Sequence, residues 1–119
     1  MSGISEYQQN AIATQSRGRL IVLLYDGAIK FCRQAIAELE KGDWAAKGKF
    51  INRVIDIVNE LDGCLDSEAG GEIATNLRSL YAFIRRHLAE ANAKRDPQRI
   101  SEVIKILEEL NEGWKAITA

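Results

Sequence analysis

Few residues in this sequence could carry out chemistry, and their spacing does not gather them into a site. His87 is the only histidine, and it stands beside Arg85 and Arg86. A nucleophile needs a base within reach, and no motif pairs Cys32 or Cys64 with His87. Two cysteines and one histidine give no zinc pattern. The Glu-x-x-His pairs of di-iron bundles and the glycine-rich phosphate loops are also missing. We therefore expect no enzyme activity, no cofactor and no metal.

The composition indicates one globular domain that stays in the cytoplasm. The chain has 119 residues, of which 46% are hydrophobic and 28% are charged, which is enough for one core. Its 16 Lys and Arg balance 17 Asp and Glu, so no overall field attracts nucleic acid. No apolar run approaches the roughly 20 residues of a membrane span, and residues 1–6 lack the regions of a signal peptide. We expect both cysteines to be reduced and buried.

Three turn signals divide the chain into long segments. Gly42-Asp43 is typical of a helix stop followed by an N-cap, and Gly70-Gly71 marks a second break. Asp96-Pro97 places a capping residue before a proline at the first helical position. The segments between these signals are about 20 to 25 residues long, the length of long helices.

Each segment repeats apolar residues at helical spacing, while strand-like alternation is nearly absent. The last segment has the cleanest stripe, which consists of Ile100, Val103, Ile104, Leu107, Leu110, Trp114 and Ile117. The stripe before it consists of Ile73, Leu77, Leu80, Tyr81, Ile84, Leu88 and Ala91. Four helices with short connections favour antiparallel neighbours. The sequence therefore predicts an all-α fold, an antiparallel up-down four-helix bundle.

The first residues differ from the rest of the chain. They are rich in Ser, Gln, Asn and Thr, and their few apolar anchors include Ile4, Tyr7 and Ile12. A short helix is marginal on its own in water. We predict an N-terminal arm or lid over residues 1–16, able to form a short extra helix and docked weakly on a bundle of residues 17–119.

The second and third segments carry more apolar surface than one buried helix face needs. Between residues 20 and 39, one stripe is Leu20, Leu24, Ala28, Phe31, Ala35 and Leu39, and the next is Ile21, Tyr25, Ile29, Cys32 and Ile36. Between residues 44 and 65, the two stripes are Ile51, Ile55, Val58 and Leu65, and Phe50, Val54, Ile57 and Leu61. Either both stripes of each helix are buried, or one lines a groove for a partner's amphipathic helix. The two alternatives are compatible if the arm is a removable lid.

A cluster of basic residues lies around the Asp96-Pro97 turn signal, mostly before it. It consists of Arg85, Arg86, His87, Lys94, Arg95 and Arg99. Cations are favoured near a helix C-terminus by the macrodipole, which accounts for the cluster structurally. The alternative is a contact patch for an acidic partner.

Several motifs, taken in order, resemble the flagellar secretion chaperone family, FliS. Residues 7–10 read Tyr-Gln-Gln-Asn, like the family's opening arm, and residues 20–31 read Leu-Ile-Val-Leu-Leu-Tyr-Asp-Gly-Ala-Ile-Lys-Phe, like its first long helix. Residues 57–61 and 80–92 match two later family segments, and the likeness runs from about residue 4 to 117. The family's Ser/Thr-Pro step is replaced here by residues 16–18, Ser-Arg-Gly, which removes a fixed φ at the helix start.

The resemblance implies a cytoplasmic export chaperone. Such proteins bind the disordered C-terminal segment of flagellin, prevent its premature polymerisation and assist its delivery to the flagellar type III export apparatus. A component of the export gate and an anti-sigma factor or other flagellar regulator are further implied partners. The alternative is a helical homo-oligomeric scaffold or adaptor with no flagellin client. We expect a monomer or weak homodimer, with no nucleic acid and no membrane insertion.

The predicted partner-binding residues come from two sources. The family match supplies Tyr7, its neighbour Ile4, and the Leu-Tyr pair at residues 24 and 25, and the second stripes supply the others. The full set is Ile4, Tyr7, Ile21, Leu24, Tyr25, Ile29, Phe50, Val54, Ile57 and Leu61.

Overall fold

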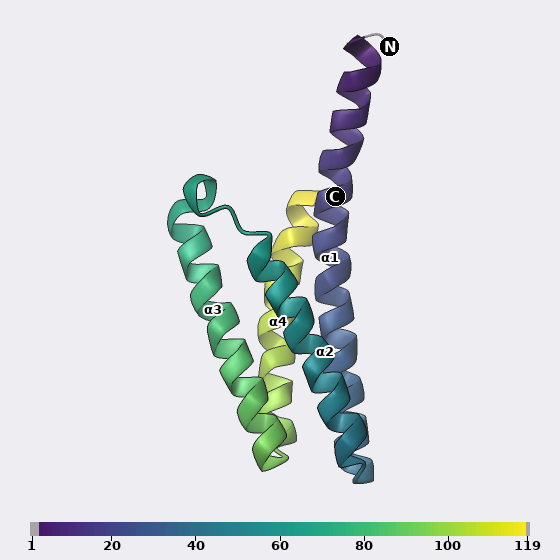
Figure 1. The fold of residues 1–119 in the computed structure, drawn as a ribbon, viewed down its shortest axis with the longest axis vertical. Coiled ribbons are helices and arrows are strands. Elements are labelled where there is room, and N and C mark those ends of the chain that lie inside the picture. Colours follow the sequence, from purple (N-terminus) through teal and green to yellow (C-terminus); the bar gives the residue numbers. More distant parts are fainter. Residues whose placement is uncertain (1–2, 119) are drawn as a thin grey trace.

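Four helices make up almost all of the structure. The computed structural model describes residues 3–118, with the side chains of residues 17–66 and 68–118. The helices are α1 (Gly3–Lys41), α2 (Trp44–Gly63), α3 (Ser67–Lys94) and α4 (Pro97–Thr118), joined by connections of two or three residues. They run up and down in an antiparallel bundle (Figure 1). Helices α1 and α3 each pack against both α2 and α4. The predicted all-α four-helix bundle is confirmed.

The turn residues act largely as their types predict. Gly42 has a φ of +79°, a left-handed conformation that ends α1. Asp43 caps α2 by accepting a hydrogen bond from the backbone N–H of Ala46 at 3.0 Å. Asp96 accepts a hydrogen bond from the backbone N–H of Gln98 at the start of α4.

The predicted break at Gly70-Gly71 is a kink rather than a connection. Helix α3 already begins at Ser67, and Asp66 caps it by accepting from the backbone N–H groups of Glu68 and Ala69. Gly71 has a φ of 52° and a ψ of −125°, which no helix allows. The connection lies earlier because Asp66 is a better N-cap than a glycine pair.

Helix α1 continues through the boundary that was expected between arm and bundle. It runs without interruption from Gly3 to Lys41, and its first turns project beyond the ends of the other helices (Figure 1). The side chains of Ile4 and Tyr7 lie outside the described residues. Docking of residues 1–16 on the bundle therefore stays a prediction.

The core is a single cluster to which all four helices contribute. It contains Tyr25, Ala28, Ile29, Cys32, Ala35, Ile51, Val54, Val58, Leu61, Tyr81, Ile84, Leu88, Ala91, Ile100, Val103, Ile104 and Leu107. Cys64 is exposed, so the expectation that both cysteines are buried is wrong for Cys64. It follows Gly63, the last residue of α2, where the helical spacing that predicted its burial ends.

We predict that Leu107→Ala lowers the free energy of unfolding by about 2 to 5 kcal/mol, because truncating a buried leucine leaves a cavity. Leu107 is fully buried in α4. Urea unfolding followed by circular dichroism measures the change.

Leu23→Ala is the matched control, since Leu23 is 65% exposed. It should change the same quantity by no more than about 0.5 kcal/mol. Equal effects of the two substitutions would contradict the assignment of Leu107 to the core.

Candidate functional site

Four of the predicted partner-binding residues are part of the core. Tyr25, Ile29, Val54 and Leu61 are buried among side chains of neighbouring helices. All four belong to the second stripes, so their burial favours the alternative in which both stripes are buried, because α1 and α2 each pack against two neighbours in the bundle. These residues offer no surface to a partner while the bundle is closed.

Four others remain partly accessible. Ile21, Leu24, Phe50 and Ile57 are half-buried and pack against the core from outside. These four side chains pack on the core with one side, and the side that stays exposed offers apolar area to a partner.

An apolar seam follows the line where α1 meets α2. We define the α1–α2 seam as Leu20, Leu24, Phe31, Phe50 and Ile57. The rings of Phe31 and Phe50 stack with centroids 6.1 Å apart. Toward the other end of the seam, a methyl group added at Gly27 would lie 3.6 Å from Ile57 Cδ1. Leu20 is 54% exposed at the end of the seam.

Arg53 covers part of this seam. Its guanidinium carbon lies 5.5 Å from the centroid of the Phe31 ring and 5.9 Å from that of Phe50. A flexible cation over two rings gains a modest attraction and can move aside. With Arg53 in place the two rings are shielded from water. When Arg53 moves aside, they become accessible to an apolar side chain of a partner.

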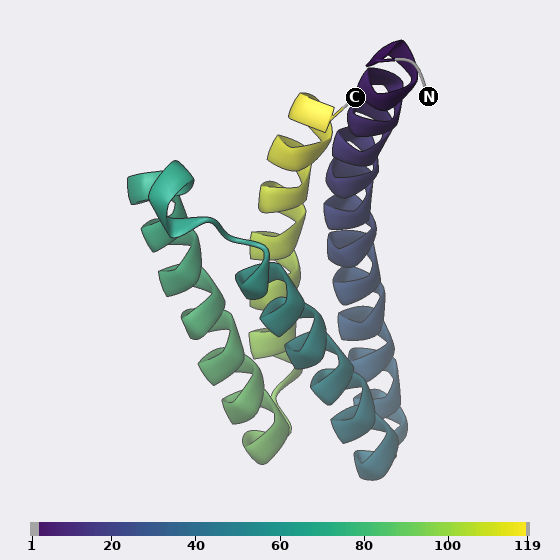
Figure 2. The ribbon, with the colours of Figure 1, turned by 45° about the horizontal axis from the view of Figure 1, so that its top comes forward.

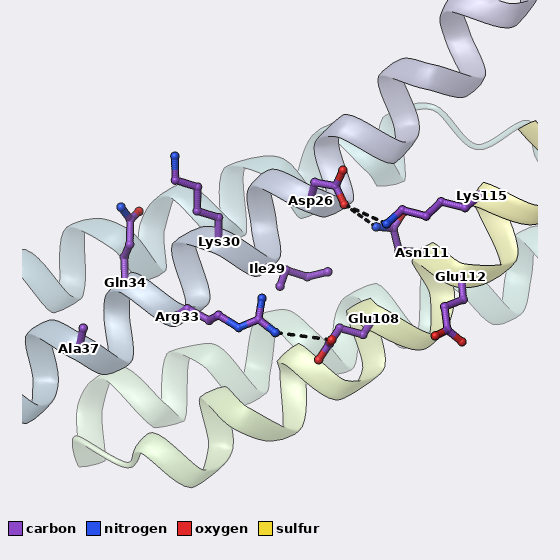
Figure 3. Close-up of a pocket in the computed structure, with 10 residues that line it drawn as sticks. All are labelled: Asp26, Ile29, Lys30, Arg33, Gln34, Ala37, Glu108, Asn111, Glu112 and Lys115. Carbon is purple, nitrogen blue, oxygen red and sulfur yellow. Dashed lines mark hydrogen bonds and ion pairs between the residues drawn. The ribbon is translucent and has the colours of Figure 1, made fainter. Parts of the chain in front are cut away.

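A second hollow lies between α1 and α4, and sequence reasoning missed it. The groove has a volume of about 560 Å³. Figure 3 shows Arg33 of α1 reaching Glu108 of α4, with 3.5 Å between the charged atoms. It also shows Asp26 Oδ1 accepting a hydrogen bond of 2.7 Å from the amide of the buried Asn111, with Lys115 Nζ 3.6 Å away. Because these residues read as solvated helix faces, no sequence signal marked them as neighbours.

Two tyrosines meet in the core across the bundle. The hydroxyls of Tyr25 on α1 and Tyr81 on α3 share a hydrogen bond of 2.6 Å. Burial raises the pKa of Tyr81 far above its ordinary value, and the hydrogen bond with Tyr25 adds to this. Burial also raises the pKa of Tyr25, against the opposing effect of hydrogen bonds with Tyr81 and Trp114. Both groups are therefore neutral and structural at physiological pH.

A buried lysine ties α2 to α3 at the other end of the bundle. Lys47 Nζ donates to the backbone oxygen of Asn92 at 3.0 Å and to its side-chain Oδ1 at 2.6 Å. Burial lowers the pKa of Lys47, and the charge of Arg95 adds to this. Arg95 in turn lies 4.1 Å above the Trp44 ring. Nothing in the residue pattern predicted this contact between α2 and α3, since lysine is almost never fully buried.

The side chains that could take part in a reaction have structural roles in the bundle. His87 Nε2 lies 2.8 Å from Glu102 Oε2, and its ring stacks on Phe83. Burial raises the pKa of the Cys32 thiol to about 12, so almost no reactive thiolate forms. Among the side chains of residues 17–66 and 68–118, no group of three His, Cys, Asp or Glu could hold a metal ion.

Most of the basic cluster pairs within the protein. Arg99 contacts both Glu90 and Asp96, while Arg85 reaches Asn59 and Asp62 of α2. These contacts favour the structural interpretation of the cluster over a patch for an acidic partner. No helix among the described residues is long and apolar enough to cross a membrane.

Comparison with known proteins gives one consistent result. The family described as "Flagellar protein FliS" matches residues 1–119. The "Flagellar secretion chaperone FliS" of Salmonella typhimurium is 43% identical, over 98% of this chain and 90% of that protein. The "Flagellar secretion chaperone FliSB" of Pseudomonas aeruginosa is 37% identical, over 99% and 97% of the two chains. The corresponding FliS of Vibrio cholerae is 35% identical, over 89% and 78%.

We predict that alkaline pH destabilises the fold through the two tyrosines. Their pKa values are raised above the ordinary 10.0, so the unfolded chain loses these protons first. Stability that is complete below pH 10 is then lost as the pH rises, by up to about 1.4 kcal/mol per pH unit for each group. Urea unfolding between pH 8 and 11 measures this loss.

Tyr81→Phe isolates the contribution of one hydroxyl. The variant should be less stable at pH 8 by about 1 kcal/mol, because it lacks the hydrogen bond, and its decline with pH should be shallower. Cys32 and Lys47 titrate alike in both proteins and cancel in the comparison. Parallel pH profiles would show that Tyr81 does not carry the effect.

Proposed function

Because the chain belongs to the FliS family of flagellar secretion chaperones, we propose that its client is flagellin. It binds the disordered C-terminal segment of flagellin in the cytoplasm and prevents premature polymerisation there. It then assists delivery of flagellin to the flagellar type III export apparatus. The observation that carries the proposal is family membership over the whole chain, combined with apolar surface beyond the needs of the core.

The α1–α2 seam supports this proposal physically. Its half-buried rings and exposed Leu20 offer what an amphipathic helix needs, namely an apolar line on a rigid support. A rigid bundle loses little entropy when it binds. The disordered segment orders itself on docking, which lowers the affinity for a given area but allows a large surface to be covered.

In this proposal the N-terminal residues regulate access of the client to the bundle. Ile4 and Tyr7 act as a lid whose weak docking a client with more apolar anchors displaces. Burial of a few such side chains yields only a few kcal/mol, from which the ordering entropy is subtracted. An export-gate component then receives the loaded chaperone, and an anti-sigma factor or other flagellar regulator competes for the free one.

Calorimetric titration with a flagellin C-terminal segment of about 40 residues tests the proposal. We predict saturable one-to-one binding with a negative heat-capacity change, and a gain of helix by circular dichroism, because apolar burial is coupled to folding. Leu20→Ser, at an exposed seam position, should weaken binding with little change in stability.

Absence of binding at high micromolar concentration would overturn the flagellin proposal and leave the bundle intact. If the same apolar surface instead made the mass of the protein concentration-dependent, the chain would be a homo-oligomeric scaffold without a flagellin client.

We predict that Tyr7→Ala changes flagellin affinity while leaving the melting temperature nearly unchanged, since Tyr7 precedes the packed part of the bundle. Calorimetry and thermal circular dichroism on the same samples separate the two effects. A large loss of thermal stability with unaltered binding would make Tyr7 a structural residue.

A further inference from the structure

One cation covers the aromatic part of the α1–α2 seam. Arg53 follows Phe50 by three residues, so the two side chains are neighbours on the surface of α2. Phe31 comes from α1, and its ring stacks on that of Phe50. The Arg53 guanidinium therefore reaches over two rings that belong to different helices, 5.5 and 5.9 Å from their centroids. An apolar side chain of a partner contacts the covered side of the rings only after Arg53 has left it.

The two rings are the contacts that hold Arg53 over the seam. Its side chain is exposed, and among the described side chains it forms no ion pair with a carboxylate. By contrast, Arg99 contacts both Glu90 and Asp96. An exposed cation over a ring is held by an attraction that changes a binding constant by only about two- to fivefold. Arg53 is thus a weakly held cover.

The helix register gives Arg53 a second resting place on its other side. Positions three residues apart on a helix differ by about 60° around its axis, so Phe50 lies to one side of Arg53 and Asp56 equally far to the other. Asp56 is exposed and lines a polar hollow along α2 together with Glu60. These two carboxylates repel each other at i, i+4 spacing, and within the described part of the chain neither has an ion pair. A guanidinium that swings away from the seam arrives beside them.

We propose that Arg53 is a removable cover that regulates the α1–α2 seam, closed over Phe31 and Phe50 and open when it pairs with Asp56. The inference rests on the proposed function for the partner that opens it, the flagellin segment. In the closed position Arg53 competes with the client for the same ring faces, so it lowers the client's affinity. In the open position the ion pair at i, i+3 spacing returns part of the lost attraction.

The cover acts equally on every partner that uses the rings. It therefore removes partners whose affinity is already marginal, such as a second copy of the chain that offers one apolar side chain. A client segment with further contacts at Leu20 and Ile57 loses the same factor and stays bound, because several anchors share its binding energy. Closing exposed rings in this way also limits the apolar patch that the unloaded protein presents to water.

Calorimetric titration of the flagellin C-terminal segment into the full chain and its Arg53→Gln variant tests the direction of the effect. Affinity should rise by about two- to fivefold, because glutamine is no cation to be displaced from the rings. Lys49→Gln is the matched control. It removes the same charge from an exposed position one turn earlier on α2, on the side away from the seam, and it should change the affinity less.

A second measurement follows the rings without any client. The neutral dye Nile red becomes brighter when it binds apolar surface, and it should bind Arg53→Gln more strongly than the original chain. Lys49→Gln should bind no more dye than the original. The melting temperature of both variants should stay within a few degrees of the original value, since the substituted side chains are exposed, so a gain of dye does not come from unfolding.

Nuclear magnetic resonance of the Arg53 side chain reports its position. The ring currents of Phe31 and Phe50 should displace the Nε–H signal of Arg53 in the free protein. This displacement should disappear when the flagellin segment binds. Asp56→Asn should alter the signal in the complex and leave it unchanged in the free protein, because Asp56 is the partner in the open position alone.

The outcomes separate the cover from the identity of the client. If Arg53→Gln weakens binding of the segment more than Lys49→Gln does, Arg53 contacts a carboxylate of the client and the proposal is overturned. Equal dye binding by all three proteins overturns it as well, whether or not the segment binds. If the original chain does not bind the segment but Arg53→Gln still gains dye, the flagellin proposal fails while the cover stands.

Discussion

The side chains packed between α1 and α3 set the width of the bundle, and they change in size along it. At one level stand Tyr25 and Tyr81, both fully buried. Toward the other end the buried residues of α1 are smaller except for Ile29, namely Ala28, Cys32 and Ala35, and the buried stripe of α3 passes through Ile84 and Leu88 to end at Ala91. A close-packed interior follows the volumes of its side chains. The core is therefore widest at the tyrosines, which agrees with the divergence of α3 and α4 where α3 begins and their convergence where α3 ends (Figures 1 and 2).

Polar contacts fix the bundle at both ends. Two hydroxyls buried without partners would each cost about 1 to 3 kcal/mol, so the hydrogen bond between Tyr25 and Tyr81 holds α1 and α3 at a set distance and register. At the narrow end, Lys47 satisfies its buried charge on Asn92. Removing one partner of such a contact costs more than the contact contributes, so each end resists sliding of α3. Ile73 and Ile117, which are 71% and 73% exposed, belong to the parts of α3 and α4 that diverge.

How far the sequence predicts this structure depends on whether a feature is local. Helix ends follow from residues such as Gly42, Asp43 and Asp96, whose conformational and hydrogen-bonding preferences act within one turn. The continuity of α1 through residue 16 and the exposure of Cys64 depend on which segments find a neighbour, and periodicity does not reveal that. The same holds for the candidate site. A stripe shows which face is apolar, but only the bundle shows that Tyr25 and Val54 are inside while Leu20 and Ile73 are outside. Lys47 and Asn111 were missed because their partners lie on other helices, far away in sequence.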